Sequence, residues 1–105
     1  MIFRVNGYSR PDGAGGHVLS ATVNADVHTW IGPKGSPHRA AWKGAKEAVR
    51  LARALGERSI TIVTPNETVV KQGTNRWSAR KRVLDRHLRD FRAMTRGMDV
   101  RWVLV

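Results

Sequence analysis

Apolar and β-branched residues recur in three short segments at the start of the chain, and this pattern predicts three β-strands. The segments are Ile2–Asn6, His17–Val23 and Val27–Ile31, and the second has its apolar and β-branched residues at Val18, Leu19, Thr22 and Val23. The stretch Gly7–Gly16 contains a proline and several glycines, so we expect a loop there. Asn24–Asp26 is short enough to be the connection of a hairpin.

The segment from Ser36 to Leu55 has the period of a helix. Serine followed by proline is a typical helix start, and Gly56 is a typical residue just after a helix end. Apolar residues recur at spacings of four and three positions, which places them on one face: Ala41, Ala45, Ala48, Ala52 and Leu55. Most of these side chains are small, so we expect the helix to lie close to a sheet.

The second half of the chain alternates between strand and helix patterns. Ser59–Thr64 is β-branched almost throughout, which is typical of a buried strand. Thr64-Pro65-Asn66-Glu67 has the form of a capping box, and it predicts a short helix from Pro65 to about Gln72. A longer helix is expected over Ser78–Arg96, followed by a last strand over Val100–Val105. The order β-β-β-α-β-α-α-β predicts one α/β domain over residues 1–105, with an antiparallel three-strand meander extended by two parallel strands.

Composition limits the classes of protein that fit. The chain has 105 residues and no cysteine, which excludes disulfides and cysteine metal sites and fits a reducing, cytoplasmic location. We find no signal peptide and no apolar run of the ~18 residues that a membrane span needs, so we expect no membrane partner. The 19 Lys and Arg against 8 Asp and Glu give a formal net charge of +11. Such a charge attracts polyanions, nucleic acid first, although it also fits a merely solvated basic surface.

Several local sequences resemble the ribonuclease H family. Val5-Asn6-Gly7-Tyr8 is similar to its first-strand Asp-Gly-Ser, Arg39-Ala40-Ala41-Trp42 to its Ala-Glu-Leu helix start, and Ile62-Val63-Thr64-Pro65-Asn66 to its Tyr-Thr-Asp-Ser. A glycine-rich turn before the second strand, the segment from Val69 to Trp77 and the last strand follow in the order that the family has. The resemblance covers essentially the whole chain, and it implies the ribonuclease H-like fold.

The resemblance also implies a loss of the family's chemistry. The family holds two magnesium ions with clustered carboxylates, because magnesium takes hard oxygen ligands and activates the attacking water. Three carboxylate positions correspond here to Asn6, Ala41 and Pro65. The fourth carboxylate of the family lies beyond the fifth strand, and this sequence ends at Val105. We therefore expect no catalytic residue, no metal site, no cofactor and no nuclease activity.

The remaining acidic and histidine residues do not suggest a replacement for this set. We interpret Glu47 as an ion-pair partner on a solvated helix face, and Glu67 as part of the capping box. Asp12 and Asp26 are interpreted as turn residues. The four histidines show no ligand spacing, so each is expected to be a surface or packed side chain. A nuclease with a relocated metal site is kept as a third hypothesis.

Basic residues are concentrated between Arg76 and Arg96, where eight Lys and Arg face two Asp. This excess favours phosphate contacts along the last helix, and Trp77 is a candidate platform for base stacking. Trp42 and Trp102 are assigned to packing, and Trp30 to either role. The predicted nucleic-acid-binding residues are Arg4, Lys34, Arg39, Lys43, Arg76, Trp77, Arg80, Lys81, Arg82, Arg86 and Arg89.

The leading hypothesis is therefore a non-catalytic nucleic-acid-binding protein on a ribonuclease H-like scaffold, with DNA and RNA not distinguished. The alternative is a protein-interaction module, for example a small virus- or phage-encoded factor that binds a host protein. In this fold Val27–Ile31 and Val100–Val105 are edge strands, and unpaired backbone groups at an edge invite pairing with another chain. We therefore also expect a homodimer, or a docked partner protein, at one of these edges.

Overall fold

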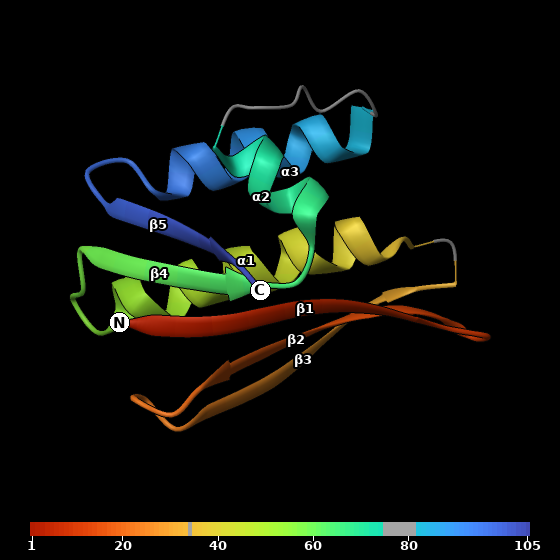
Figure 1. Cartoon of the computed structure of the whole chain (residues 1–105), viewed down its shortest axis with the longest axis horizontal. Helices are drawn as coiled ribbons and strands as arrows, with labels where there is room; N and C mark the ends of the chain where they lie inside the picture. The colour runs from red at the N-terminus through yellow and green to blue at the C-terminus, as the bar shows by residue number, and fades with distance from the viewer. Residues whose placement is uncertain (34, 75–81) are drawn as a thin grey trace.

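The computed structural model describes residues 1–33, 35–74 and 82–105, except for the side chains of residues 82–85. Over these residues, five strands form one sheet in the order β3-β2-β1-β4-β5 (Figure 1). Neighbours among the first three strands are antiparallel, whereas β4 runs parallel to β1 and β5 runs parallel to β4. This topology confirms the predicted mixed α/β sheet. The strands are β1 (Ile2–Arg10), β2 (Gly13–Ser20), β3 (Ala25–Gly32), β4 (Ser59–Thr64) and β5 (Asp99–Leu104).

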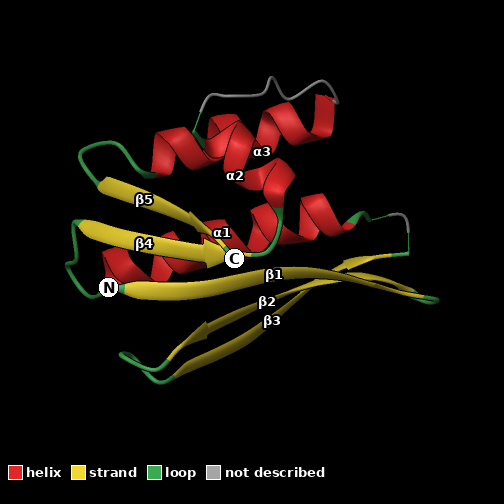
Figure 2. Ribbon diagram, viewed as in Figure 1, coloured by secondary structure: helices red, strands yellow, loops and turns green. Residues whose placement is uncertain are grey.

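The helices pack on one face of this sheet (Figure 2). α1 (Pro37–Ala54) contacts the first four strands, α2 (Glu67–Gly73) contacts β5, and α3 (Arg82–Met94) packs beside α1. Within the described chain the opposite face of the first three strands carries no helix, and we call it the open face. Its exposed residues alternate with buried or half-buried ones, as the period of a strand requires: Ile2, Arg4, Asn6, Leu19, Asp26, His28 and Trp30. Among the described residues, no helix is long and apolar enough to cross a membrane.

The first hairpin differs from the prediction, because the expected loop Gly7–Gly16 is mostly strand. β1 continues to Arg10 and β2 begins at Gly13, so that only Pro11 and Asp12 form the turn. The glycines serve another purpose, since a side chain at Gly7 would overlap the carbonyl oxygen of Pro37 in α1. Glycine therefore lets the helix lie directly on the strands, and the loop prediction was wrong.

The turn of the second hairpin also differs from the prediction. β2 ends at Ser20 rather than at Val23, and residues 21–24 form the turn. Asn24 adopts a φ of 51°, a left-handed conformation that asparagine tolerates better than most residues. Asp26 consequently lies within β3 and not in a turn, which corrects the interpretation of this residue.

The predicted start of α1 is confirmed. The hydroxyl of Ser36 accepts a hydrogen bond from the backbone N–H of Arg39 at 3.2 Å, and Pro37 opens the helix. Leu55, expected on the buried face, is instead 57% exposed, because it lies beyond the last turn as the C-cap. Gly56 follows with a φ of 74°.

The start of α2 differs from the predicted capping box. Asn66 is the N-cap, and its side-chain oxygen accepts from the N–H of Val69 at 3.1 Å. Thr64 stays in β4, where it pairs with Leu104 of β5. Glu67 therefore has no capping role and forms an ion pair with Lys71 at 2.7 Å.

An aromatic cluster joins the helices to β5. The ring of Trp42 lies 5.3 Å from that of Phe91 in α3 and 5.6 Å from that of Trp102 in β5. Trp42 is fully buried, and its Nε1–H donates to the side-chain oxygen of Gln72 in α2 at 2.8 Å. The assignment of Trp42 and Trp102 to packing is confirmed. Of the long helix expected over Ser78–Arg96, residues 78–81 lie outside the described chain, and Gly97 follows its end with a φ of 75°.

Candidate nucleic-acid interface

Basic side chains of α1 and α3 meet on one side of the molecule. Arg39, Lys43 and Lys46 follow one another on α1 at spacings of four and three residues, so they share a face. Lys46 Nζ lies 3.5 Å from a carboxylate oxygen of Asp90 in α3. Arg86, one turn before Asp90, is exposed. We call these four basic residues, Arg39, Lys43, Lys46 and Arg86, the α1/α3 basic surface.

His87 of α3 lies close enough to this surface for the charges of α1 to affect its pKa. The imidazole is about half-buried, and its Nδ1 makes no hydrogen bond within the described part of the chain. The pKa of His87 is lowered to about 4, first by burial and then by the positive charges of Lys46 and Arg39, while Asp90 acts in the opposite direction. Positive charges from α1 therefore act on a group carried by α3, and His87 is neutral at neutral pH.

Two residues of α1 at this surface differ in how their polar groups are satisfied. The Nε of Arg39 is buried and has no hydrogen-bond partner among the described residues. Lys43 Nζ donates to the backbone carbonyl of Trp30 at 3.1 Å, which extends the surface towards β3. Arg50, one turn beyond Lys46, is instead paired with Glu47, and this pair lowers the pKa of the Glu47 carboxyl. The sequence-based interpretation of Glu47 is thus confirmed.

The structure brings together only part of the predicted binding set. Arg39, Lys43 and Arg86 contribute to one surface, and Arg89 is also exposed on α3. Arg4 lies on the open face of the sheet, away from the helices, so it does not join them. The sequence prediction missed Lys46, although its spacing from Arg39 and Lys43 was a usable signal. Arg82 begins α3 with its side chain outside the description, and the remaining residues lie outside the described chain: Lys34, Arg76, Trp77, Arg80 and Lys81.

An open hollow of about 350 Å³ lies where β1 and β4 approach α1 and α2. Two of the three positions that the resemblance gives to carboxylates, Asn6 and Pro65, line it. The third, Ala41, is fully buried in α1. His38 also lines the hollow, with its Nδ1 3.2 Å from the side-chain oxygen of Asn66.

The donors around this hollow do not fit a pair of magnesium ions. Glu67 is the only carboxylate among the described lining residues, and its Oε1 lies 2.7 Å from Lys71 Nζ. Magnesium binds through several hard oxygen ligands, usually with more than one carboxylate in a two-metal site. One carboxylate that is already paired with an ammonium group does not provide this set.

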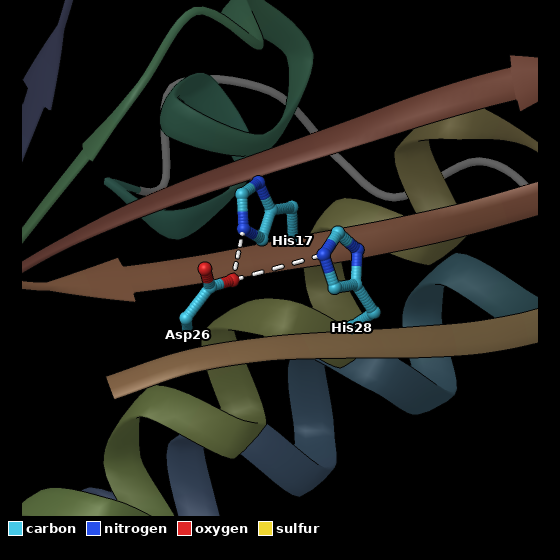
Figure 3. Close-up of side chains that lie close together, drawn as sticks. All are labelled: His17, Asp26 and His28. Atoms are coloured by element: carbon cyan, nitrogen blue, oxygen red, sulfur yellow. Dashed lines mark hydrogen bonds and ion pairs between the residues drawn. The ribbon is translucent and has the colours of Figure 1, made fainter. Parts of the chain in front are cut away.

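A different cluster lies on the open face, and it was not anticipated from the sequence. His17 in β2 and His28 in β3 are paired across the two strands, and Asp26 lies two residues before His28 (Figure 3). The structure thus brings two histidines and one aspartate together, although each histidine was expected only as a surface or packed side chain. The spacing Asp26-x-His28 was the available signal, since alternate residues of a strand share a face.

Comparisons with known proteins give similarity in structure only. No protein-family model matches the sequence, and no curated protein matches it significantly. The N-terminal RNase H domain of a Mycobacterium tuberculosis protein, solved as a fusion with maltose-binding protein, has a TM-score of 0.77 at 19% identity, covering 100% of this chain and 87% of that chain. RNase H1 of the halophilic archaeon Halobacterium salinarum has a TM-score of 0.74 at 22% identity, covering 99% of this chain and 82% of that chain.

A third similar structure is LC11-RNase H1 in complex with an RNA/DNA hybrid, a protein isolated from compost by a metagenomic approach. Its TM-score is 0.81 at 14% identity, and the match covers 99% of this chain and 83% of that chain. At these identities the similarity establishes the fold. The strand order, the mixed pairing and these three matches together show that this chain has the ribonuclease H-like fold.

Proposed function

We propose that this protein binds nucleic acid through the α1/α3 basic surface and does not cleave it. The observation that carries the proposal is the convergence of three basic side chains of α1, Arg39, Lys43 and Lys46, on His87 of α3, whose pKa is lowered to about 4 first by burial and then by these charges. Clustered Lys and Arg attract the phosphate backbone and release its counterions. The formal net charge of +11 favours the same class of ligand over the whole chain.

The fold supports nucleic acid as the general class of ligand. One structure of similar fold is a complex with an RNA/DNA hybrid. The scaffold is therefore compatible with a double-helical ligand, and we expect a hybrid or duplex to bind at least as well as a single strand. Phosphate contacts position a protein on a helix without reading its sequence, so little sequence specificity is expected.

The absence of cleavage is inferred from the hollow beside β1 and β4. Asn6 and Pro65 occupy two positions that the resemblance gives to magnesium-binding carboxylates, and Glu67 is engaged by Lys71. Without a cluster of carboxylates, the ions that activate water in this fold family would have no adequate ligands. The proposal therefore assigns binding, and not hydrolysis, to the scaffold.

The test is a salt titration of binding to single- and double-stranded DNA, RNA and an RNA–DNA hybrid, measured by fluorescence anisotropy. The variant is Lys43→Gln with Lys46→Gln. For a duplex, loss of two phosphate contacts should flatten the slope of log affinity against log salt by about 1.8, because each contact contributes about 0.9. Both lysines have at least partly exposed side chains on α1, so the fold should be retained.

The matched control removes the same amount of charge elsewhere. Arg58 and Arg101 are exposed at the start of β4 and on β5, so Arg58→Gln with Arg101→Gln should leave the slope nearly unchanged. Equal losses in both double variants would show that only net charge matters, which contradicts a defined surface. Binding that is absent, or that is indifferent to strand type and vanishes near physiological salt, would instead favour the protein-interaction module.

A further inference from the structure

Three potential ligand atoms lie together on the open face of the sheet. His17 Nε2 is 2.7 Å from Asp26 Oδ1, and His28 Nε2 is 3.7 Å from the same oxygen. The two imidazole rings are stacked, with centroids 4.2 Å apart and planes inclined by 7°. One nitrogen from each histidine and one carboxylate oxygen lie within 4.8 Å of one another (Figure 3).

The strand register holds this arrangement in place. His17 and His28 are directly paired between β2 and β3, so their side chains leave the sheet at the same point and on the same side. Asp26 precedes His28 by two residues and shares its face. The backbone of two adjacent strands therefore sets the three positions, and only side-chain rotation is needed to adjust the donors.

We propose that His17, Asp26 and His28 form a binding site for one divalent transition-metal ion of the zinc class. Two imidazoles and one carboxylate are the donors that such ions take in sites that leave a fourth position to water. Magnesium and calcium are disfavoured, because they require mostly oxygen ligands. The site lies apart from the α1/α3 basic surface, and the proposal does not depend on nucleic-acid binding.

The two distances from the histidine nitrogens to Asp26 Oδ1 are close to those between ligands of a tetrahedral ion. With metal–ligand bonds of about 2.0–2.1 Å, two ligands of a tetrahedron are about 3.3 Å apart. The His28–Asp26 distance of 3.7 Å must shrink by about 0.4 Å, and the His17–Asp26 distance of 2.7 Å must grow by about 0.6 Å. The ion would take the place of the proton in the His17–Asp26 hydrogen bond, and that proton would move from Nε2 to Nδ1 of His17, so that a neutral imidazole binds the ion.

The positively charged surroundings favour a cation that is coordinated by imidazole nitrogen over one that is held by charge alone. Arg4 faces the same side of the sheet, in the row that crosses Leu19 and Asp26, and the formal net charge is +11. This positive field weakens any cation held by attraction alone. An ion with a strong preference for imidazole nitrogen loses less affinity, which further favours zinc over magnesium.

The side chains are accessible to an ion from solvent. The exposed fraction of the side chain is 28% for His17, 66% for Asp26 and 60% for His28. Substitutions here should therefore leave the core intact, and far-UV circular dichroism provides the check. His38, which bonds to Asn66 and lies outside the cluster, serves as the matched control.

The experiment titrates zinc chloride into tag-free, chelator-treated protein by calorimetry, with imidazole signals followed by NMR. We expect one zinc ion per protein and joint shifts of the His17 and His28 signals, with those of His38 and His87 unchanged. His28→Gln should lower the affinity by at least roughly tenfold, since loss of even an outer-shell partner costs 10- to 100-fold. His38→Gln should leave the affinity unchanged.

Several results would overturn the proposal. Absence of saturable zinc binding would do so, and so would retained affinity in His28→Gln or shifts confined to His38 and His87. Unchanged affinity in Asp26→Asn would remove the carboxylate from the site and refute the three-ligand arrangement. Magnesium binding at the same residues would refute the assignment to the zinc class.

Discussion

The hydrogen bond between Trp42 and Gln72 is predicted to be a major contribution to stability, because neither partner can turn to water. Trp42 is fully buried, Gln72 is 3% exposed, and the Nε1–Oε1 distance is 2.8 Å. Gln72→Leu removes the acceptor and leaves the indole N–H unpaired in the core. Such a loss costs about 1–3 kcal/mol. For a chain of about this length, a loss of about 2 kcal/mol lowers Tm by about 8–16 °C.

The reciprocal variant, Trp42→Phe, removes the donor but keeps an aromatic ring beside Phe91 and Trp102. It leaves the oxygen of Gln72 unpaired and opens a small space, so we expect a cost of about 2–4 kcal/mol. The double variant removes both polar partners at once. Its cost should be smaller than the sum of the single costs by about 1–2 kcal/mol, because no unpaired group remains.

Urea unfolding followed by far-UV circular dichroism measures these costs, and an unchanged m-value shows that the comparison is valid. Trp30→Phe is the matched control, since Trp30 is 49% exposed on the open face. Its effect should stay within about 0.5 kcal/mol. Costs that simply add in the double variant, or a Gln72→Leu variant as stable as the parent, would refute the reasoning.

Three further predictions concern chemistry, pH and assembly. The purified protein should not cleave an RNA–DNA hybrid with magnesium or manganese, and cleavage that is lost in Glu67→Gln would contradict this. The pKa of His87 is about 4 in the folded chain against 6.5 for a free imidazole, so protons bind the unfolded chain more tightly. The unfolding free energy of the parent protein should therefore fall relative to that of His87→Gln as pH falls from about 6.5 towards 4. A difference between the two proteins that stays constant between pH 7 and pH 5 would refute this. Sedimentation should show a homodimer that forms through the edge of β5. The backbone N–H of Val105 donates to Thr64 in β4, so the N–H of Leu104 points to the free edge, and Leu104→Pro should dissolve the dimer. A parent protein that is monomeric at every concentration would exclude the dimer.

Local sequence patterns predicted those elements whose ends depend on neighbouring residues. Ser36 and Pro37 mark the start of α1 because the capping hydrogen bond spans only three residues. The β-branched run of β4 and the small residues of α1 likewise match the structure. The order of these elements, together with the resemblance, was enough to predict the sheet topology.

Other features depended on which strands and helices meet. The glycines of the first hairpin resemble a loop in the sequence, but Gly7 lies beneath α1, where a side chain would collide with the helix backbone. Thr64 resembles a helix cap, yet its pairing with Leu104 keeps it in β4 and moves the cap to Asn66. In both cases a contact distant in sequence outweighs a local preference.

The candidate sites likewise combine features that the sequence determines with features that depend on the tertiary structure. The sequence by itself determined the excess of positive charge, the absence of cysteine and the identity of the residues at the resembled carboxylate positions, because these are properties of composition and order. Only the tertiary structure decided that Lys46 joins Arg39 and Lys43 around His87, and that Arg4 lies on the opposite face. It likewise placed His17 beside His28, since the register between β2 and β3 joins residues eleven positions apart. Side chains brought together by strand pairing and helix packing leave little trace in local spacing, because their neighbours in space are not their neighbours along the chain.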